Sequence, residues 1–325
     1  MSISQASIKD YKEIVEFIKK NYSVNHILTK NKKVFFYFYA KKKKLNFLIL
    51  KYKKKIVSIL GFLINNHKKK YIWLALWVSK KNQIFSGIKL LKRLENTFNK
   101  KIFVLGLNDY TKKIMEQLNY KIKTMNHYYF TNNNIDKFKI IKNPLSNKKK
   151  LNKNSQLFFE EIKKENLNKY NKIILSRSYI DFKDFKFKYI NNQFYHYKFY
   201  LLKKYNRKLL IITRTIIVKK IDRKVIRIID AFGDYNLFKY TRNLFLYLLK
   251  DLSIEYIDLI NVGIPANFFF CSGMKLINYN KTIVPNFFEP FKKKNKKIYF
   301  AYNKIFKKKI IVFKGDGDQE RPNLI

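Results

Sequence analysis

The order of predicted helices and strands occurs twice along the chain, and this repeat restricts the fold more than any other sequence feature. In the first half we expect two helices, three strands, a helix, a strand, a helix and a closing strand. The second half follows the same order, although the two halves share little sequence. A repeated order over this length indicates two copies of one structural unit. The sequence therefore predicts two α+β domains in tandem, each a twisted mixed β-sheet flanked by helices.

Hydrophobic spacing supports this order in the first half. Ser7 and Asp10 predict a helix start, after which apolar residues recur at helical spacing. Short runs rich in β-branched and aromatic residues predict strands at 45–52, 56–64, 71–78 and 102–107. Further helices are expected around 34–39, from Gly87 onward and from Asn108 to Leu118, and a closing hairpin or strand is expected over 120–130.

The second half shows patterns of the same kind. Strands are predicted at 194–203, 208–219, 224–229 and 254–260. Helical stretches are expected within 157–180, and helices at 237–252 and 265–274. Runs of Asn and Lys with Pro144 separate the halves and are typical of a linker. We expect a first domain over 1–135, a linker over 136–155, and a second domain over 156–325 that ends in an acidic tail.

The charge of the chain is extreme, with 71 basic against 22 acidic residues and a net charge of +49. Such a balance normally indicates a polyanionic partner. Only eight of the basic residues are Arg, however, and residues with A/T-rich codons are in excess together, as a nucleotide bias would produce. Nucleic-acid readers favour the planar fork of Arg. We therefore expect solvated Lys faces and no nucleic-acid partner, with tRNA as an alternative and electrostatic contact with an anionic membrane left open.

Composition also restricts the compartment. Cys271 is the single cysteine, which excludes a disulfide framework and a Cys-based zinc cluster. The longest apolar stretch, 56–64, is the length of a strand and is too short to span a membrane. Ser4, Gln5 and Ser7 stand where the apolar part of a signal peptide would begin. We expect a cytoplasmic protein.

Several segments of the first half resemble the acyl-coenzyme A dependent N-acetyltransferase superfamily, usually called GNAT. They are the strand 71–78, the loop 82–88 with Gln83 and Gly87, and the segments Asn108-Asp109-Tyr110-Thr111 and Met115-Glu116-Gln117-Leu118-Asn119-Tyr120. The resemblance implies that acetyl-CoA, or another acyl-CoA, binds here. In the family the strand edge pairs with pantetheine and the glycine loop before the next helix holds the diphosphate. The resemblance therefore assigns Val78, Ser86, Gly87 and Asn108 to cofactor binding.

The second half carries weaker counterparts of the same segments. Residues 228–234 take the place of the edge strand and its loop, so the resemblance assigns Gly233 to cofactor binding as well. A turn glycine is the structural alternative. The family tyrosine that protonates the leaving thiolate falls on Met115 in the first half and on Phe269 in the second. The loop of the first half has only one glycine, Gly87, where the family loop is richer in glycine. The second half is therefore expected to be the catalyst.

The end of the chain is the most distinctive segment. Residues 284–291 and 314–323 resemble the ending of tandem GNAT proteins found among bacterial surface-polysaccharide genes. This resemblance implies acylation of an amino sugar in polysaccharide biosynthesis, and hence an amine-bearing small molecule or sugar as substrate.

Attack of an amine on a thioester needs a group that takes the amine proton. Candidates are Asp230 and Asp234 at the end of a predicted strand, and His196 between two tyrosines. The structural alternatives are a helix cap or loop hydrogen bond for Asp230 and a packed aromatic-face position for His196. Asp258 stands between apolar residues, where a buried carboxylate needs a partner such as Arg214 or Arg227. The histidines lack metal-like spacing, and no metal is expected.

Asp316, Asp318 and Glu320 form an acidic cluster near the C-terminus. The downstream Glu of a calcium loop does not follow within this sequence, and we expect no calcium site here. Two interpretations remain. The cluster either binds Lys or Arg side chains of the first half and so fixes the two domains together, or it receives a substrate ammonium group.

The sequence thus predicts an acyl-CoA-dependent N-acyltransferase that acts on an amine. Two alternatives stay open. One is a transferase that builds peptide bridges from aminoacyl-tRNA, which would suit the Lys excess. The other is a non-catalytic scaffold in which both acyl-transfer sites have been lost.

Overall fold

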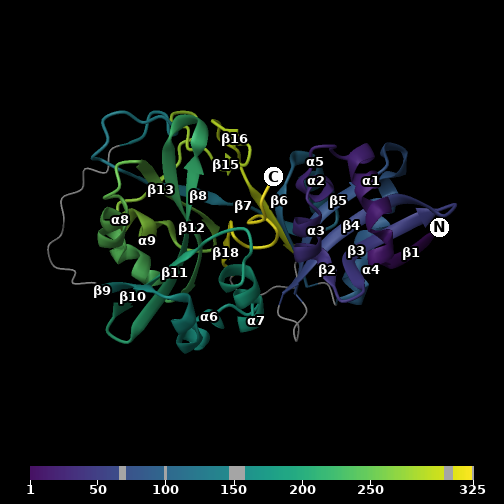
Figure 1. Ribbon diagram of the computed structural model, residues 1–325, viewed down its shortest axis with the longest axis horizontal. Helices are drawn as coiled ribbons and strands as arrows, with labels where there is room; N and C mark the ends of the chain where they lie inside the picture. The colour runs from purple at the N-terminus through teal and green to yellow at the C-terminus, as the bar shows by residue number, and fades with distance from the viewer. Residues whose placement is uncertain (66–70, 99–100, 146–157, 304–309, 324–325) are drawn as a thin grey trace. The chain divides into compact units, whose positions relative to one another are not determined.

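The computed structural model describes residues 1–65, 71–98, 101–145, 158–303 and 310–323 (Figure 1). The described chain forms two compact units, which we treat separately. Unit 1 comprises residues 1–123 together with the described residues of 298–303 and 317–323. Unit 2 comprises 124–297 and 310–316, again within the described ranges. In these ranges no helix is long and apolar enough to cross a membrane.

Unit 1 is built on one eight-stranded mixed sheet with the order β1-β3-β4-β5-β6-β17-β7, and β2 pairs with β3. Its strands are β1 (Ser2–Ser7), β2 (Ala40–Lys41), β3 (Lys44–Tyr52), β4 (Lys55–Asn65), β5 (Tyr71–Ser79), β6 (Ile102–Leu107), β7 (Tyr120–Thr124) and β17 (Tyr299–Asn303). The first four in spatial order are antiparallel neighbours, whereas β5 and β6 run parallel.

Helices flank this sheet (Figure 1). They are η1 (Ile8–Asp10), α1 (Tyr11–Asn21), α2 (Ile27–Lys30), α3 (Lys32–Tyr39), η2 (Lys81–Gln83), α4 (Ile84–Thr97) and α5 (Asp109–Gln117). The expected start at Ser7 is confirmed, because Ser7 and Asp10 form a reciprocal capping box. The apolar face of α4, with Leu90, Leu91 and Leu94, is buried in one core with the sheet.

Unit 2 repeats the architecture with a second eight-stranded mixed sheet of order β14-β8-β13-β12-β11-β10-β9, and β18 pairs with β13. Its strands are β8 (Asn126–Thr131), β9 (Phe158–Ile162), β10 (Lys198–Lys204), β11 (Arg207–Val218), β12 (Arg223–Gly233), β13 (Ile254–Val262), β14 (Lys275–Leu276) and β18 (Val312–Phe313). A separate pair is formed by β15 (Phe287–Phe288) and β16 (Phe291–Lys292). Again one central pair, β12 and β13, is parallel.

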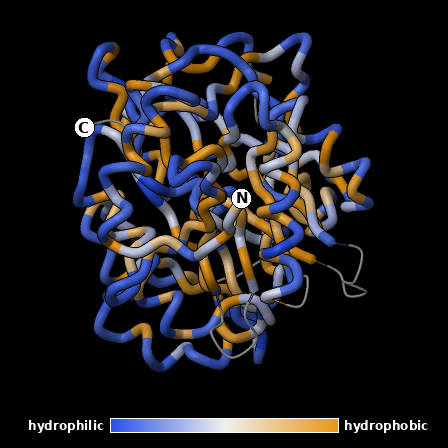
Figure 2. The backbone as a smooth tube through the Cα atoms, turned by 90° about the vertical axis from the view of Figure 1, so that its right-hand side faces the viewer, coloured by the Kyte–Doolittle hydropathy of each residue, from blue (hydrophilic) through white to orange (hydrophobic). Residues whose placement is uncertain are grey.

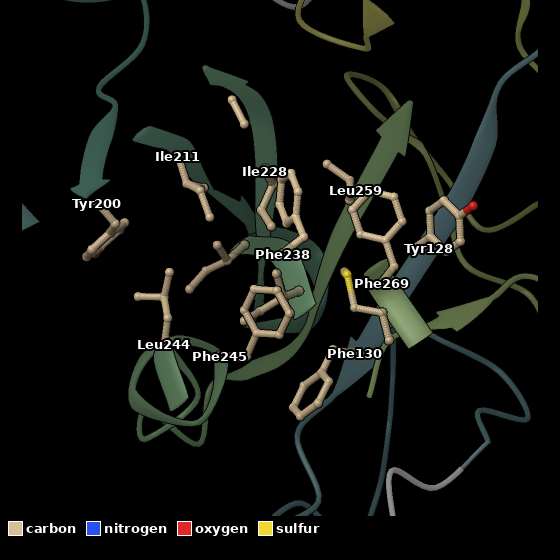
Figure 3. Close-up of a cluster of buried hydrophobic side chains, with 14 of the residues drawn as sticks. Tyr128, Phe130, Tyr200, Ile211, Ile228, Phe238, Leu244, Phe245, Leu259 and Phe269 are labelled. Atoms are coloured by element: carbon tan, nitrogen blue, oxygen red, sulfur yellow. The ribbon is translucent and has the colours of Figure 1, made fainter. Parts of the chain in front are cut away.

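The helices of unit 2 are shorter. They are η3 (Lys164–Tyr170), α6 (Asn171–Ile174), α7 (Phe182–Phe185), η4 (Lys186–Ile190), η5 (Lys219–Ile221), η6 (Tyr235–Tyr240), α8 (Arg242–Leu248) and α9 (Ala266–Cys271). Figure 3 shows Phe238, Phe245 and Phe269 from the helices packed against strand residues such as Ile228 and Leu259. In Figure 2 long hydrophobic stretches of the tube lie mainly in the interior and hydrophilic stretches mainly along the outer turns, as expected when apolar burial drives folding.

Two strands join a sheet far from their position in the sequence. β17 lies between β6 and β7 in the sheet of unit 1. In the sequence, however, β8 to β16 separate it from all other strands of that sheet. β8 follows β7 directly, yet it pairs with β13 in the sheet of unit 2. The two α+β folds predicted from the sequence are confirmed. Each compact unit is discontinuous in sequence, in contrast to the continuous division at 135 and 156 that we expected.

The expected linker is in part an ordered piece of unit 2. Ile140 and Ile141 are buried against Tyr129 and Tyr256. Residues 146–155 of that linker lie outside the described residues.

Candidate functional site

In each unit the parallel strand pair separates partway along, leaving a fork. In unit 1 the last paired residues of β5 and β6 are Leu74 and Val104, and β5 continues to Ser79. In unit 2 the last pair of β12 and β13 is Ile228 with Leu259, and β12 continues to Gly233. We call these regions the unit 1 fork and the unit 2 fork. Where a strand extends beyond its neighbour, its unpaired backbone N–H and C=O groups can pair with an extended ligand.

The unit 2 fork is filled by the protein's own main chain. β18 pairs antiparallel with the end of β13, matching Phe313 with Asn261. The next two residues then bridge the fork, because Lys314 N donates to Ile260 O over 2.9 Å and Gly315 N donates to Ile229 O over 3.1 Å. A Cβ on Gly315 would lie 2.4 Å from Ile229 Cγ2 and 2.7 Å from Ile229 O, so only glycine permits this approach.

Asp316 fastens the filling segment. Its carboxylate is fully buried and accepts hydrogen bonds from Phe313 N (2.9 Å), Tyr179 Oη (3.0 Å) and Arg177 Nη1 (3.2 Å). Lys188 Nζ lies 3.5 Å from the other carboxylate oxygen. These partners belong to the second half of the sequence, so the idea that Asp316 binds basic residues of the first half is wrong.

Asp230, the first predicted base, belongs to the same buried group. Arg177 Nη2 lies 2.6 Å from both of its oxygens, and Tyr189 Oη donates to Oδ2 over 2.5 Å. Burial raises the pKa of Asp230 and the nearby Asp316 charge adds to this, whereas the Arg177 guanidinium acts in the opposite direction. With an exposed fraction of 0% and strong internal partners, this carboxylate has the surroundings of a structural ion pair.

The other site residues predicted in the second half lie in different local environments. Asp234 caps η6, accepting from Asn236 N over 3.0 Å, and lies 3.5 Å from Arg207 Nε. Gly233 has a φ of +113°, and a Cβ there would lie 2.3 Å from Lys208 O, so the neighbouring strand requires this glycine. His196 is exposed on the loop before β10. Asp230, Gly233 and Asp234 thus share the end of β12, and His196 comes from a different element.

The unit 1 fork has a different environment. β5 leads through η2 directly into α4, so the amides of the first helical turn follow the free end of the strand. Ser86 is buried and its Oγ donates to Gln83 O over 2.5 Å. A Cβ on Gly87 would lie 2.4 Å from Trp77 Nε1 and 2.8 Å from Ser79 Oγ. Gly87 therefore lets the helix start pack against the end of β5.

The remaining cofactor candidates border the same fork. Val78 is buried on β5 and pairs with Ile59 of β4. Asn108 follows β6, is exposed, and caps α5 by accepting from Thr111 N over 2.7 Å. Met115, at the position of the family tyrosine, is fully buried in the core. The structure thus brings Val78, Ser86, Gly87 and Asn108 to elements around one fork.

The C-terminal tail reaches the unit 1 fork by side chains. Gln319 Nε2 donates to Leu105 O, the first carbonyl of β6 beyond the paired region, over 3.3 Å. Asp318 accepts from Arg321 Nε over 2.9 Å and from Tyr39 Oη over 3.3 Å. Asp318 therefore fixes the tail within unit 1, through a tyrosine of the first half and a neighbouring arginine.

His26 lies beside this tail, with Nε2 at 3.3 Å from Arg321 Nη2. Burial lowers the pKa of His26 to about 4, and the Arg321 charge adds to this effect while Asp318 opposes it. The imidazole is consequently neutral near pH 7.

A second buried ion network in unit 2 was only partly expected. Asp258 accepts from Arg227 Nε at 2.8 Å and Nη2 at 2.5 Å, which confirms one of its two proposed partners. Arg214 instead bonds Glu289 over 3.3 Å. His127 Nε2 lies 2.9 Å from Asp258, a contact that no sequence spacing indicated. Burial would raise the pKa of Asp258, but the Arg227 charge and these hydrogen bonds hold it below its usual value. Among the described residues, no three His, Cys, Asp or Glu side chains gather as metal ligands.

No family model matches the chain, and a search of curated proteins found no match. Solved structures do resemble it. A GCN5-related N-acetyltransferase from Anabaena variabilis aligns with 92% of this chain and 72% of its own at 10% identity and a TM-score of 0.56. A probable N-acyltransferase from Enterococcus faecalis aligns with 92% of this chain and 72% of its own, at 8% identity and a TM-score of 0.54. A GCN5-related N-acetyltransferase from Kribbella flavida aligns with 92% of this chain and 70% of its own, at 8% identity and a TM-score of 0.51. At these identities the likeness shows the fold: both units together have the mixed-sheet architecture of GNAT acetyltransferases.

Proposed function

We propose that the protein is an acyl-CoA-dependent N-acyltransferase whose unit 1 fork binds the acyl carrier. The observation that carries this proposal is the run of β5 from Ala75 to Ser79 past its last pairing with β6, directly before the start of α4. Unit 2 contributes no carrier site in this proposal, because its fork holds residues 312–315. The predicted base roles of Asp230, Asp234 and His196 are accordingly not part of it.

The residues around the unit 1 fork suit a thioester carrier in specific ways. The free edge of β5 offers alternating donors and acceptors to the amides of a pantetheine arm. The first amides of α4, near Ser86 and Gly87, are suited to a diphosphate because a helix N-terminus carries unpaired donors and positive dipole. Trp77 covers Gly87, so the amides rather than an open glycine loop would hold that group.

The carrier supplies an activated acyl group, and this chain would orient it for attack by a neutral amine. A backbone N–H of β5 at the fork would stabilise the developing oxyanion. Met115 cannot donate a proton, but a departing thiolate, with a pKa of about 8.5 for an ordinary thiol, needs little help from an acid. The acceptor in this proposal is an amine-bearing sugar of surface-polysaccharide synthesis.

Calorimetric titration with acetyl-CoA, together with thermal melting, tests the proposal. Ala75→Arg places a bulky charge at the half-buried mouth of the fork. Ile217→Arg, at a 60% exposed position on β11, is the matched control. We expect binding heat and a raised Tm for the parent and for Ile217→Arg, and loss of both for Ala75→Arg.

Other outcomes would point elsewhere. Binding that survives Ala75→Arg would contradict the unit 1 assignment. No binding by the parent would reject acyl-CoA as donor, and tight tRNA binding at physiological salt would then favour the aminoacyl-tRNA alternative. If the protein binds neither donor, the remaining interpretation is a non-catalytic scaffold, for which the filled unit 2 fork and Met115 would be the supporting observations. For the acceptor, thiol release stimulated by glucosamine but not by glucose supports an amino sugar.

A further inference from the structure

Unit 2 contains an open pocket of about 720 Å³ that lies outside both forks. Its walls come from two stretches far apart in sequence, 136–144 and 283–293. Lys137, Lys142 and Lys293 line it, and Asp136 is its one acidic lining residue among those the structure describes. We call this the lysine pocket.

The walls of the lysine pocket are held in place by buried contacts. Glu255, fully buried on β13, accepts the backbone N–H groups of Lys139 (2.6 Å), Ile140 (2.8 Å) and Ile141 (3.2 Å). Lys142 exchanges two backbone hydrogen bonds of 3.0 Å with Ile283. Because these bonds fix both stretches, the pocket exists before any ligand arrives, which lowers the entropic cost of binding.

A short bond ties the two lysine-rich stretches to each other. Lys293 Nζ donates to Lys139 O over 2.5 Å, so the side chain of Lys293 reaches the other stretch. Lysines occur over the whole chain, and their number alone indicates nothing. The lysine pocket differs from other lysine-rich surface because three lysines line one hollow and a single acidic residue, Asp136, lies among the described lining residues.

The rest of the lining is apolar. Phe138, Ile141, Pro144 and Ile283 supply it, with Ile141 buried and the other three half-buried. Lysine stems cover apolar surface while the ammonium groups stay in water. This combination suits a ligand with a phosphate group joined to an apolar part. RNA is less suited, because the described lining contains no Arg and a single, half-buried aromatic residue for base stacking.

We propose that the lysine pocket binds the phosphate head group of an anionic phospholipid at a membrane surface. The phosphate would lie among Lys137, Lys142 and Lys293, and the glycerol end would contact Pro144 and Ile283. Lysine side chains near an anionic membrane surface are attracted to its head groups. The proposal does not rest on the acyltransferase function, since the pocket and the unit 1 fork belong to different units.

Co-sedimentation of the full chain with vesicles tests it, using phosphatidylcholine with and without phosphatidylglycerol. The pocket variant is Lys137→Gln/Lys142→Gln/Lys293→Gln. The control is Lys163→Gln/Lys169→Gln/Lys183→Gln, three exposed lysines of the same unit with the same charge change. Each lysine near an anionic surface contributes about fivefold, so the pocket variant should lose on the order of a hundredfold in partitioning to the anionic vesicles. The control should lose less than about tenfold.

Each remaining outcome has a defined meaning. Equal losses in both triple variants would overturn the proposal and leave general charge attraction. A pocket variant that binds anionic vesicles as well as the parent would overturn it too. Lys137→Gln/Lys142→Gln alone, which keeps the Lys293 bond, should still lose about twentyfold and guards against misfolding.

Soluble probes distinguish the lipid from other anions. A short-chain phosphatidylglycerol should raise the Tm of the parent but not of the pocket variant. If inorganic phosphate does so equally well at the same concentration, a free phosphate is the ligand and the lipid proposal fails. If the pocket substitutions weaken binding of a single-stranded RNA more than binding of vesicles, the surface serves nucleic acid instead.

Discussion

The two forks start from the same architecture and end in opposite states. Both lie where a central parallel strand pair separates, and in both the longer strand has an irregular register with its antiparallel neighbour, near Leu60 in one unit and Ile212 in the other. In unit 2 the gap is bridged by main-chain hydrogen bonds, whereas in unit 1 a glutamine side chain reaches one carbonyl. The fold therefore provides the gap, and the segment laid into it decides whether a ligand can enter.

The largest effect is expected from removing the segment that serves both forks. A chain that ends at Lys297 lacks β17 and β18, so the sheet of unit 1 loses an internal strand and the unit 2 fork loses its filling. We expect no cooperative melting by circular dichroism and rapid proteolysis. Supplying residues 298–325 as a peptide should restore protection in part. A cooperative transition in the shortened chain would show that the units fold without this segment.

Next in size is the ion cluster that fastens the filling of unit 2. Arg177→Met leaves Asp230 and Asp316 buried without their shared partner, which typically costs about 3–5 kcal/mol of unfolding free energy. Denaturant unfolding measures this. Lys198→Met, which breaks an exposed pair with Glu161, should change stability by less than about 1 kcal/mol. Equal effects of the two substitutions would mean that the buried cluster is not what holds the segment.

A pH-dependent effect is expected for the tail in unit 1. The pKa of His26 is about 4 in the folded protein and about 6.5 when unfolded, so the unfolded state binds the extra proton between these values. The stability from neutral His26 is complete above pH 6.5 and is lost as the pH falls toward 4, by on the order of 3 kcal/mol. His26→Gln should flatten the stability profile in that window. An unchanged profile would contradict the buried, neutral imidazole.

The smallest effect concerns the helix start at the unit 1 fork. Gly87→Ala forces a methyl group against the indole of Trp77 and should cost about 1–3 kcal/mol by overpacking. Adding Trp77→Leu should recover most of this loss in thermal melting, because the two residues are in contact and their effects are not additive. Failure of the second substitution to rescue the first would show that Gly87 is required for another reason.

Local patterns were enough to predict much of the fold. Short apolar runs rich in β-branched and aromatic residues predict β3 to β6 and β10 to β13, the helix start at Asn108 is confirmed, and Arg227 is one of the two partners expected for Asp258. The expected helix over 237–252 is instead a 3₁₀ turn followed by α8. β1 is not predicted, and β9 lies within 157–180, where helical stretches are expected. These errors are small because each element has its own periodic signal.

The fork contents could not be predicted in this way. β18 has two residues and no periodicity, and its pairing with β13 depends on a chain separation of about fifty residues, which carries no local signal. The same holds for β17 in the sheet of unit 1. Sequence reasoning noticed Asp316 and Asp318 as unusual acids, but their partners Arg177 and Tyr39 are set by the tertiary fold.

The position of β17 has a consequence for how the chain can be divided. Residues 124–316 contain every strand of the unit 2 sheet, whereas no continuous stretch holds all strands of the unit 1 sheet without most of unit 2, because β17 is encoded after β16. A chain cut after residue 123 would therefore leave the unit 1 sheet without an internal strand. Unit 1 thus depends on unit 2 as the connection that carries the chain to β17, whether or not unit 2 itself binds a ligand.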